Sequence, residues 1–105
     1  MKSIKTLKTA LEKSHMTSHK GYVNATYAQL VAVLDEPVFN EPSGDDKTQK
    51  SWVVSYKGNV FTIYDWKTYD AEYTMNELDR WNVGGHGSVP AYDFIDALEA
   101  KIQAL

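Results

Sequence analysis

The chain contains no cysteine, which excludes a disulfide framework, a thiolate nucleophile and a cysteine-based zinc site. No apolar run approaches the roughly 18 residues that cross a bilayer. The lysine-bearing start lacks an apolar stretch followed by a small-residue cleavage site, so we expect no signal peptide. These absences predict a soluble protein of the cytoplasm.

A catalytic signature is also missing. Asp65, Asp70, His86 and Ser88 are the candidate acids, base and nucleophile, but nothing in their spacing fixes their mutual geometry. Geometry is the first test of a catalytic set. We therefore expect a protein that is not an enzyme and that uses no cofactor and no metal.

The chain does have enough apolar and aromatic residues for one folded domain. Its 105 residues are 43% hydrophobic and 12% aromatic, which suits a single core and argues against disorder. The charge is uneven: residues 1–20 hold five lysines and one glutamate, whereas residues 35–105 hold thirteen acidic and six basic residues. We expect residues 1–20 to form a basic helix or arm with a linker, and residues 21–105 to form an α+β domain.

Helical spacing and capping residues predict two helices in the first third of the chain. The first covers residues 4–14, where apolar residues recur every three or four positions, and a polar linker follows it. The second covers residues 27–35. Thr26 and Gln29 form a capping-box pattern at its start, and Pro37 forbids its continuation.

A third helix is predicted over residues 89–104, with Ser88 as its N-cap and Pro90 in its first turn. One apolar stripe runs along it at alternating steps of four and three: Ala91, Ile95, Leu98, Ile102 and Leu105. This stripe suits either the cover of a sheet or a contact in a homodimer.

A β-hairpin is predicted in the middle of the chain. Two β-rich segments flank Gly58-Asn59, a dipeptide that accepts the positive φ angles of a tight turn. With a two-residue loop there, Tyr56 lies opposite Phe61 and Val54 lies opposite Ile63. Five residues then share one face, which we expect to be core: Trp52, Val54, Tyr56, Phe61 and Ile63.

A short third strand is expected around Trp81 and Val83, and residues 68–80 are expected to form a loop with one helical turn. Helices and strands in this order predict the α+β class. The expected architecture is a small antiparallel sheet, made of the hairpin and the short third strand, covered on one face by helices.

Three glycines, Gly84, Gly85 and Gly87, stand with His86 between the third strand and the last helix. A strand, a glycine-rich turn and a helix N-terminus can bind an anion, because unpaired backbone N–H groups point outward there. The spacing matches no phosphate-binding motif, and glycine is also the usual residue where φ must be positive. Both a nucleotide-binding loop and a structural turn fit the segment.

The stretch Asp65-Trp66-Lys67 ends the second strand of the hairpin. An indole that stacks on a base and a lysine that meets a phosphate suit ligand recognition. The alternative is an indole that closes the edge of the core between two solvated charges. The candidate ligand-binding residues are Asp65, Trp66, Lys67, Trp81, Gly84, Gly85, His86 and Ser88.

Three motifs occur in a fixed order along the chain. A Gly-Tyr pair at residues 21–22 precedes a helix that ends near Pro37, a Trp-led hairpin ends in Thr62–Lys67, and Trp81 opens a Trp-Asn-Val-Gly-Gly segment. In this order the motifs resemble a family of small uncharacterised accessory proteins of tailed bacteriophages, over about residues 21–100.

The chain departs from this group at Asp35 and Asn82, where the group often has glycine and histidine. The resemblance implies an accessory protein of the host cytoplasm that binds stoichiometrically and inhibits a host or antiviral-defence protein. The candidate partner-binding residues are Tyr69, Asp70, Glu72, Tyr73, Glu77 and Asp79, because interface centres favour exposed aromatic side chains.

Two alternatives to a protein-binding function remain open. In the first, the chain sequesters a nucleotide or a nucleotide-derived signal at residues 65–67 and 84–88. In the second, the lysines of residues 1–20 bind a nucleic acid, and the affinity then falls steeply with salt.

Overall fold

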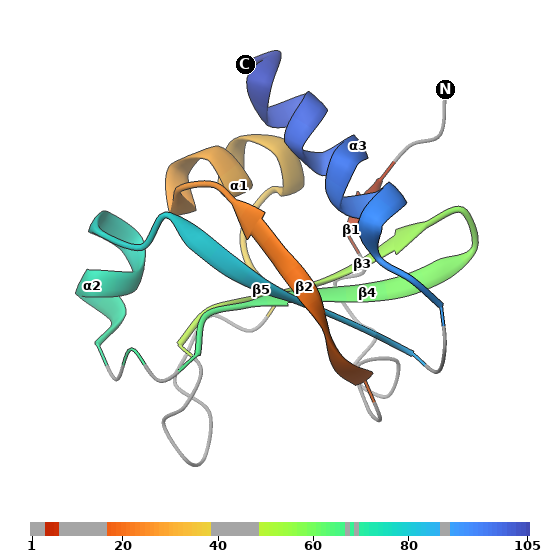
Figure 1. Ribbon diagram of the computed structural model, residues 1–105. Helices are drawn as coiled ribbons and strands as arrows, with labels where there is room; N and C mark the ends of the chain where they lie inside the picture. Colours follow the sequence, from red (N-terminus) through yellow and green to blue (C-terminus); the bar gives the residue numbers. More distant parts are fainter. Residues whose placement is uncertain (1–3, 7–16, 39–48, 67, 69, 87–88) are drawn as a thin grey trace.

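The described residues form a five-stranded antiparallel sheet and three helices, with α1 and α3 on the same face of the sheet (Figure 1). The expected class, an α+β domain with an antiparallel sheet covered on one face by helices, is confirmed. The computed structural model describes residues 4–6, 17–38, 49–66, 68, 70–86 and 89–105.

The strands are β1 (Lys5–Thr6), β2 (Thr17–Asn24), β3 (Ser51–Tyr56), β4 (Asn59–Tyr64) and β5 (Arg80–His86). They lie in the order β1-β3-β4-β5-β2, so β3 and β4 form the hairpin and β2 and β1 are the two edges. The short strand predicted around Trp81 and Val83 is β5, which is longer than expected and lies between β4 and β2.

The prediction for the start of the chain is wrong wherever the structure describes it. Lys5–Thr6 pairs with β3 instead of opening a helix, and residues 7–14 lie outside the described residues. The described part of the segment expected to be a polar linker, residues 17–21, lies in β2. Backbone pairing with β5 stabilises β2 regardless of its polar side chains, and the register shifts once, between His19 and Gly21.

The hairpin is confirmed, but its register differs from the expected one. Tyr56 pairs with Asn59 and Val54 with Phe61, because the turn residues are Lys57 and Gly58. Both have positive φ, 53° and 79°, as a tight two-residue turn requires. Moving the turn by one residue shifts the pairing by two, so the expected core face is preserved, and all five of its residues are buried: Trp52, Val54, Tyr56, Phe61 and Ile63.

The capping box predicted for the second helix is present. Thr26 N donates to Gln29 Oε1 at 2.9 Å and Gln29 N donates to Thr26 Oγ1 at 3.2 Å. Helix α1 (Tyr27–Leu34) therefore begins where the sequence predicts. Helix α2 (Ala71–Asn76) is the single short helix expected in the acidic segment, and the side chain of Asp70 caps its N-terminus.

Helix α3 (Tyr92–Gln103) begins later than predicted, so Pro90 precedes the helix instead of lying in its first turn. Ser88 lies outside the described residues. The predicted stripe is right in its middle, where Leu98 and Ile102 are buried, but Leu105 is 66% exposed. The sequence pattern missed Phe94, which is fully buried and stacks on Phe61 with ring centroids 4.6 Å apart.

The glycine-rich segment is strand where it was expected to be loop. Gly84 and Gly85 lie within β5, paired on one side with β2 and on the other with β4. A Cβ at Gly85 would lie 3.3 Å from Cδ1 of Phe61, so the missing side chain leaves room for the ring that α3 covers. Neither glycine belongs to a turn, and Gly87 lies outside the described residues.

Two fully buried tryptophans in the core differ in their hydrogen bonding. Their rings meet edge to face at 5.3 Å. Trp52 Nε1 donates to the carbonyl of Asp35 at 2.9 Å, whereas Trp81 Nε1 is buried and has no hydrogen-bond partner among the described residues. An unsatisfied buried donor costs about 1–3 kcal/mol.

This difference predicts unequal effects of the same substitution. Trp52→Phe breaks a hydrogen bond, whereas Trp81→Phe removes an unsatisfied donor, and both lose similar ring area. We expect Trp52→Phe to destabilise the protein by about 1–2 kcal/mol more than Trp81→Phe. Urea unfolding of the two variants measures the difference, and equal losses would contradict the assignment.

Candidate functional site

A row of side chains crosses the face of the sheet that α1 and α3 do not cover. Asn82 of β5 pairs with Tyr22 of β2 on one side and with Tyr64 of β4 on the other, so the three side chains share that face. Asn82 Nδ2 also donates a long hydrogen bond, 3.4 Å, to the carbonyl of Tyr64. The row forms the floor from which the candidate site is built.

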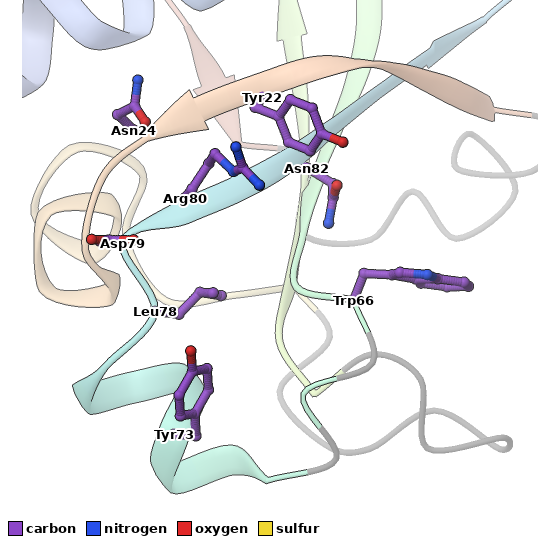
Figure 2. Close-up of a pocket in the computed structure, with 8 residues that line it drawn as sticks. All are labelled: Tyr22, Asn24, Trp66, Tyr73, Leu78, Asp79, Arg80 and Asn82. Carbon is purple, nitrogen blue, oxygen red and sulfur yellow. The ribbon is translucent and has the colours of Figure 1, made fainter.

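A groove of about 640 Å³ opens between this face and α2. Its lining residues, which define the aromatic groove, are Tyr22, Asn24, Trp66, Tyr73, Leu78, Asp79, Arg80 and Asn82. Figure 2 shows Tyr22, Arg80 and Asn82 on the sheet side, Tyr73 on α2, and Trp66 on the segment that follows β4. A second hollow of about 360 Å³ adjoins it and is lined by His19, Tyr22, Tyr64, Trp66 and Asn82.

Three rings of the groove are about half exposed, Tyr22 at 48%, Trp66 at 49% and Tyr73 at 47%. Each ring comes from a different element, and the sheet and α2 hold them in place. The guanidinium carbon of Arg80 lies 4.5 Å from the ring centroid of Tyr22, a cation–π contact. Rings and a guanidinium thus form the accessible surface of the site.

The rings on the sheet side are held by their neighbours. Trp66 meets Tyr64 edge to face at 6.3 Å, and His19 meets Tyr22 in the same way at 4.8 Å. Burial raises the pKa of Tyr64 above its usual value, and the nearby Tyr22 raises this pKa further. The phenol of Tyr64 is therefore protonated at neutral pH and can donate a hydrogen bond.

The α2 end of the groove is acidic. A smaller hollow of about 250 Å³ on α2 is lined by Asp70, Glu72, Tyr73, Asn76 and Glu77. Tyr73 belongs to both this hollow and the aromatic groove, and Asp79 lies on the groove side. The structure thus brings together five of the six predicted partner-binding residues, and the sixth, Tyr69, lies outside the described residues.

Asp65, a predicted ligand-binding residue, has its carboxylate fully buried. Oδ1 accepts hydrogen bonds from the backbone N–H groups of Gln49 and Lys50 at 2.8 and 3.0 Å. Oδ2 accepts from the hydroxyls of Thr68 and Thr74 at 3.0 and 2.7 Å. The side chain therefore ties the start of β3, the end of β4 and α2 together below the groove.

The other predicted ligand-binding residues do not gather at one place. Trp81 is fully buried in the core, Gly84 and Gly85 lie in the middle of the sheet, and His86 is half-buried at the end of β5. Lys67 and Ser88 lie outside the described residues. Of this predicted set, the aromatic groove contains Trp66.

Sequence reasoning missed most of the sheet side of the groove, namely Tyr22, Asn24, Arg80 and Asn82. A signal was present in the alternation of Arg80 and Asn82 with the apolar Trp81 and Val83, which is typical of a strand with one exposed face. Pairing this strand with the segment around Tyr22 required the tertiary structure.

No described helix is long and apolar enough to cross a membrane. Within the described part of the chain, no group of three or more His, Asp or Glu side chains is arranged to hold a metal ion. Comparison of the chain with protein-family models, curated proteins and solved structures finds no match, so its function is argued from the geometry of the groove.

Proposed function

We propose that this protein acts by stoichiometric binding of another protein through the aromatic groove, and that the partner is a host or antiviral-defence protein which it inhibits. The observation that carries the proposal is the grouping of Tyr22, Trp66, Tyr73 and Arg80 around one open groove. Tryptophan, tyrosine and arginine are the residues that most often dominate the binding energy of protein interfaces.

The exposure of the rings favours a protein over a small molecule. Sites for small molecules bury most of the ligand surface, typically about 70–90%, inside a concave pocket. Here each ring remains about half exposed, and the groove continues into the hollows beside Tyr64 and on α2. An extended surface of this kind suits a convex segment of a partner, because aromatic rings set among polar side chains are typical of interfaces between proteins that also exist apart.

The class of partner is proposed from the resemblance to phage accessory proteins. Three residues that carry this resemblance, Tyr22, Tyr64 and Trp66, line the groove or the hollow that adjoins it. The aromatic rings, amides and guanidinium of the groove provide contact area and hydrogen bonds, and these are sufficient for binding another protein. The proposal therefore needs no chemical step.

One observation favours a second candidate function, the binding of a nucleotide. Trp66 and Arg80 line the same groove, where an indole can stack on a base and a guanidinium can meet a phosphate. Calorimetric titration with mono-, di- and cyclic nucleotides tests this candidate, and heat of binding that Trp66→Ala abolishes would favour it over protein binding.

The protein-binding proposal predicts that Trp66→Ala weakens partner binding by about 30-fold or more, which corresponds to about 2 kcal/mol. Stability should fall by about 1–3 kcal/mol, because about half of the indole is buried and it packs edge to face on Tyr64, so thermal unfolding is measured to confirm that the variant is folded. The partner is first captured from a bacterial host lysate by crosslinking and then purified. Calorimetry measures its affinity for the wild-type chain and for each variant.

Tyr92→Ala is the matched control. Tyr92 is 69% exposed at the start of α3, outside the groove. The substitution removes an exposed aromatic ring that lies outside the proposed contact surface, so the affinity of this variant for the partner should equal that of the wild type. Equal affinities of the Trp66→Ala and Tyr92→Ala variants for the purified partner would show that the groove is not the contact surface.

A further inference from the structure

We infer that the partner places an arginine or lysine side chain on the ring of Tyr73, between the carboxylates of α2 and Asp79. This inference rests on the proposed function, since it names the chemistry of the partner at the same groove. Three features of the described residues support it: the unbalanced charge, the exposure of Tyr73 and a contact that the chain already makes within the groove.

The α2 end of the groove carries an excess of negative charge. Asp70, Glu72, Glu77 and Asp79 are exposed, and none of them forms an ion pair with another described residue. Arg80 is the one cation among the described residues that line the groove and the hollow on α2. Its guanidinium lies over the ring of Tyr22, so within the described part of the chain no cation pairs with the carboxylates around α2.

Tyr73 borders both the groove, with Asp79, and the acidic hollow on α2, with Asp70, Glu72 and Glu77. Its ring is 47% exposed and makes no ring or cation contact with another described residue. The face of an aromatic ring attracts a cation, and carboxylates beside it strengthen that attraction.

The groove already contains one pair of the proposed kind. Arg80 lies over Tyr22 at 4.5 Å, which means that a guanidinium is stable on a tyrosine ring in this environment. Tyr73 offers a second ring of the same type on α2, across the groove from Tyr22 (Figure 2). Three carboxylates, those of Asp70, Glu72 and Glu77, line the hollow beside it. A phosphate at this end would be repelled by the same carboxylates, so the charge favours a basic segment over a polyphosphate.

The test uses oligoarginine, oligolysine and oligoglutamine peptides of equal length as probes, added to the full-length ¹⁵N-labelled protein. We expect both basic peptides to shift the amide resonances of Glu72, Tyr73 and Glu77, with affinity that falls as NaCl is raised. A planar guanidinium stacks better than an ammonium, so tighter binding of oligoarginine identifies arginine as the group. The neutral peptide should leave these resonances unchanged.

Matched variants make the test specific. The isosteric double variant Glu72→Gln, Glu77→Gln should weaken oligoarginine binding by about tenfold, and Tyr73→Leu should also weaken it, whereas Tyr73→Phe should not. Asp96→Asn removes an exposed carboxylate of α3 and is the control. Equal affinity of the double variant and the Asp96→Asn variant would overturn the inference, as would shifts that spread equally to α3.

The purified partner separates this inference from the proposed function. If Trp66→Ala weakens partner binding and the double variant binds like the wild type, the inference of a basic side chain on Tyr73 is wrong, and the groove remains the contact surface. If neither change matters, both proposals fail. Thermal unfolding of each variant confirms that it is folded, which is expected because Glu72, Tyr73 and Glu77 are exposed.

Discussion

Replacing Asp65 with alanine is expected to lower the free energy of unfolding by about 3–5 kcal/mol. The substitution removes the acceptor of two backbone N–H groups and two threonine hydroxyls, at a site where Gln49 and Thr74 are buried and Lys50 and Thr68 are half-buried. Domains of this size are commonly stable by about 5–15 kcal/mol, so the loss is a large fraction of the total. Urea unfolding followed by tryptophan fluorescence measures it.

Two milder variants test the cause. Asp65→Asn keeps an oxygen that accepts from Gln49 and Lys50, and its amide can donate to the hydroxyls of Thr68 and Thr74. Thr74→Val removes one donor and keeps the shape of the side chain. Each should cost about 1–2 kcal/mol. If Asp65→Asn were as damaging as Asp65→Ala, the acceptor geometry would not be the reason for the loss.

Phe94→Ala is expected to cost about 3–5 kcal/mol, because it leaves a cavity in the middle of the core. The ring is fully buried and is stacked on Phe61 at 4.6 Å with an interplanar angle of 2°, and Tyr56 lies 5.9 Å away. The contact holds α3 on the hairpin. Thermal and urea unfolding measure the loss.

Ile95→Ala is the matched control for this helix. Ile95 is half-buried beside Gly21, where its Cδ1 would lie 3.1 Å from an added Cβ. A smaller loss of about 1–2 kcal/mol is expected there, because the side chain already meets solvent. Equal losses at Phe94 and Ile95 would mean that the stacked rings do not dominate the packing of α3.

Local sequence signals predicted the elements that local interactions stabilise. The capping box at Thr26 and Gln29 located α1, and the alternation of residues 52–56 and 61–63 identified the core face of the hairpin. The turn was misplaced by one residue because Lys57 adopts a positive φ, while its ammonium pairs with Asp93 at 2.6 Å. A lysine carries no sequence signal for that conformation.

The remaining strands depend on partners far along the chain. The first half of β2 is polar, so neither periodicity nor propensity identifies it, and pairing with β5 makes it a strand. The groove was missed for the same reason, since Tyr22 and Asn82 meet across these two strands. The sequence predicts Asp65 to be a ligand-binding residue, because its position between aromatic residues does not reveal that Thr68 and Thr74 donate hydrogen bonds to it.

The pairing of β2 with β5 also determines when a newly made chain can assemble the aromatic groove. β3 and β4 are consecutive in the sequence and can pair as soon as both have been synthesised. β2 can pair with β5 only after residues 80–86 have left the ribosome. Contacts between such distant segments close slowly and late. The guanidinium of Arg80 reaches the ring of Tyr22 only once β2 and β5 have paired, so a product truncated before β5 lacks the sheet side of the groove.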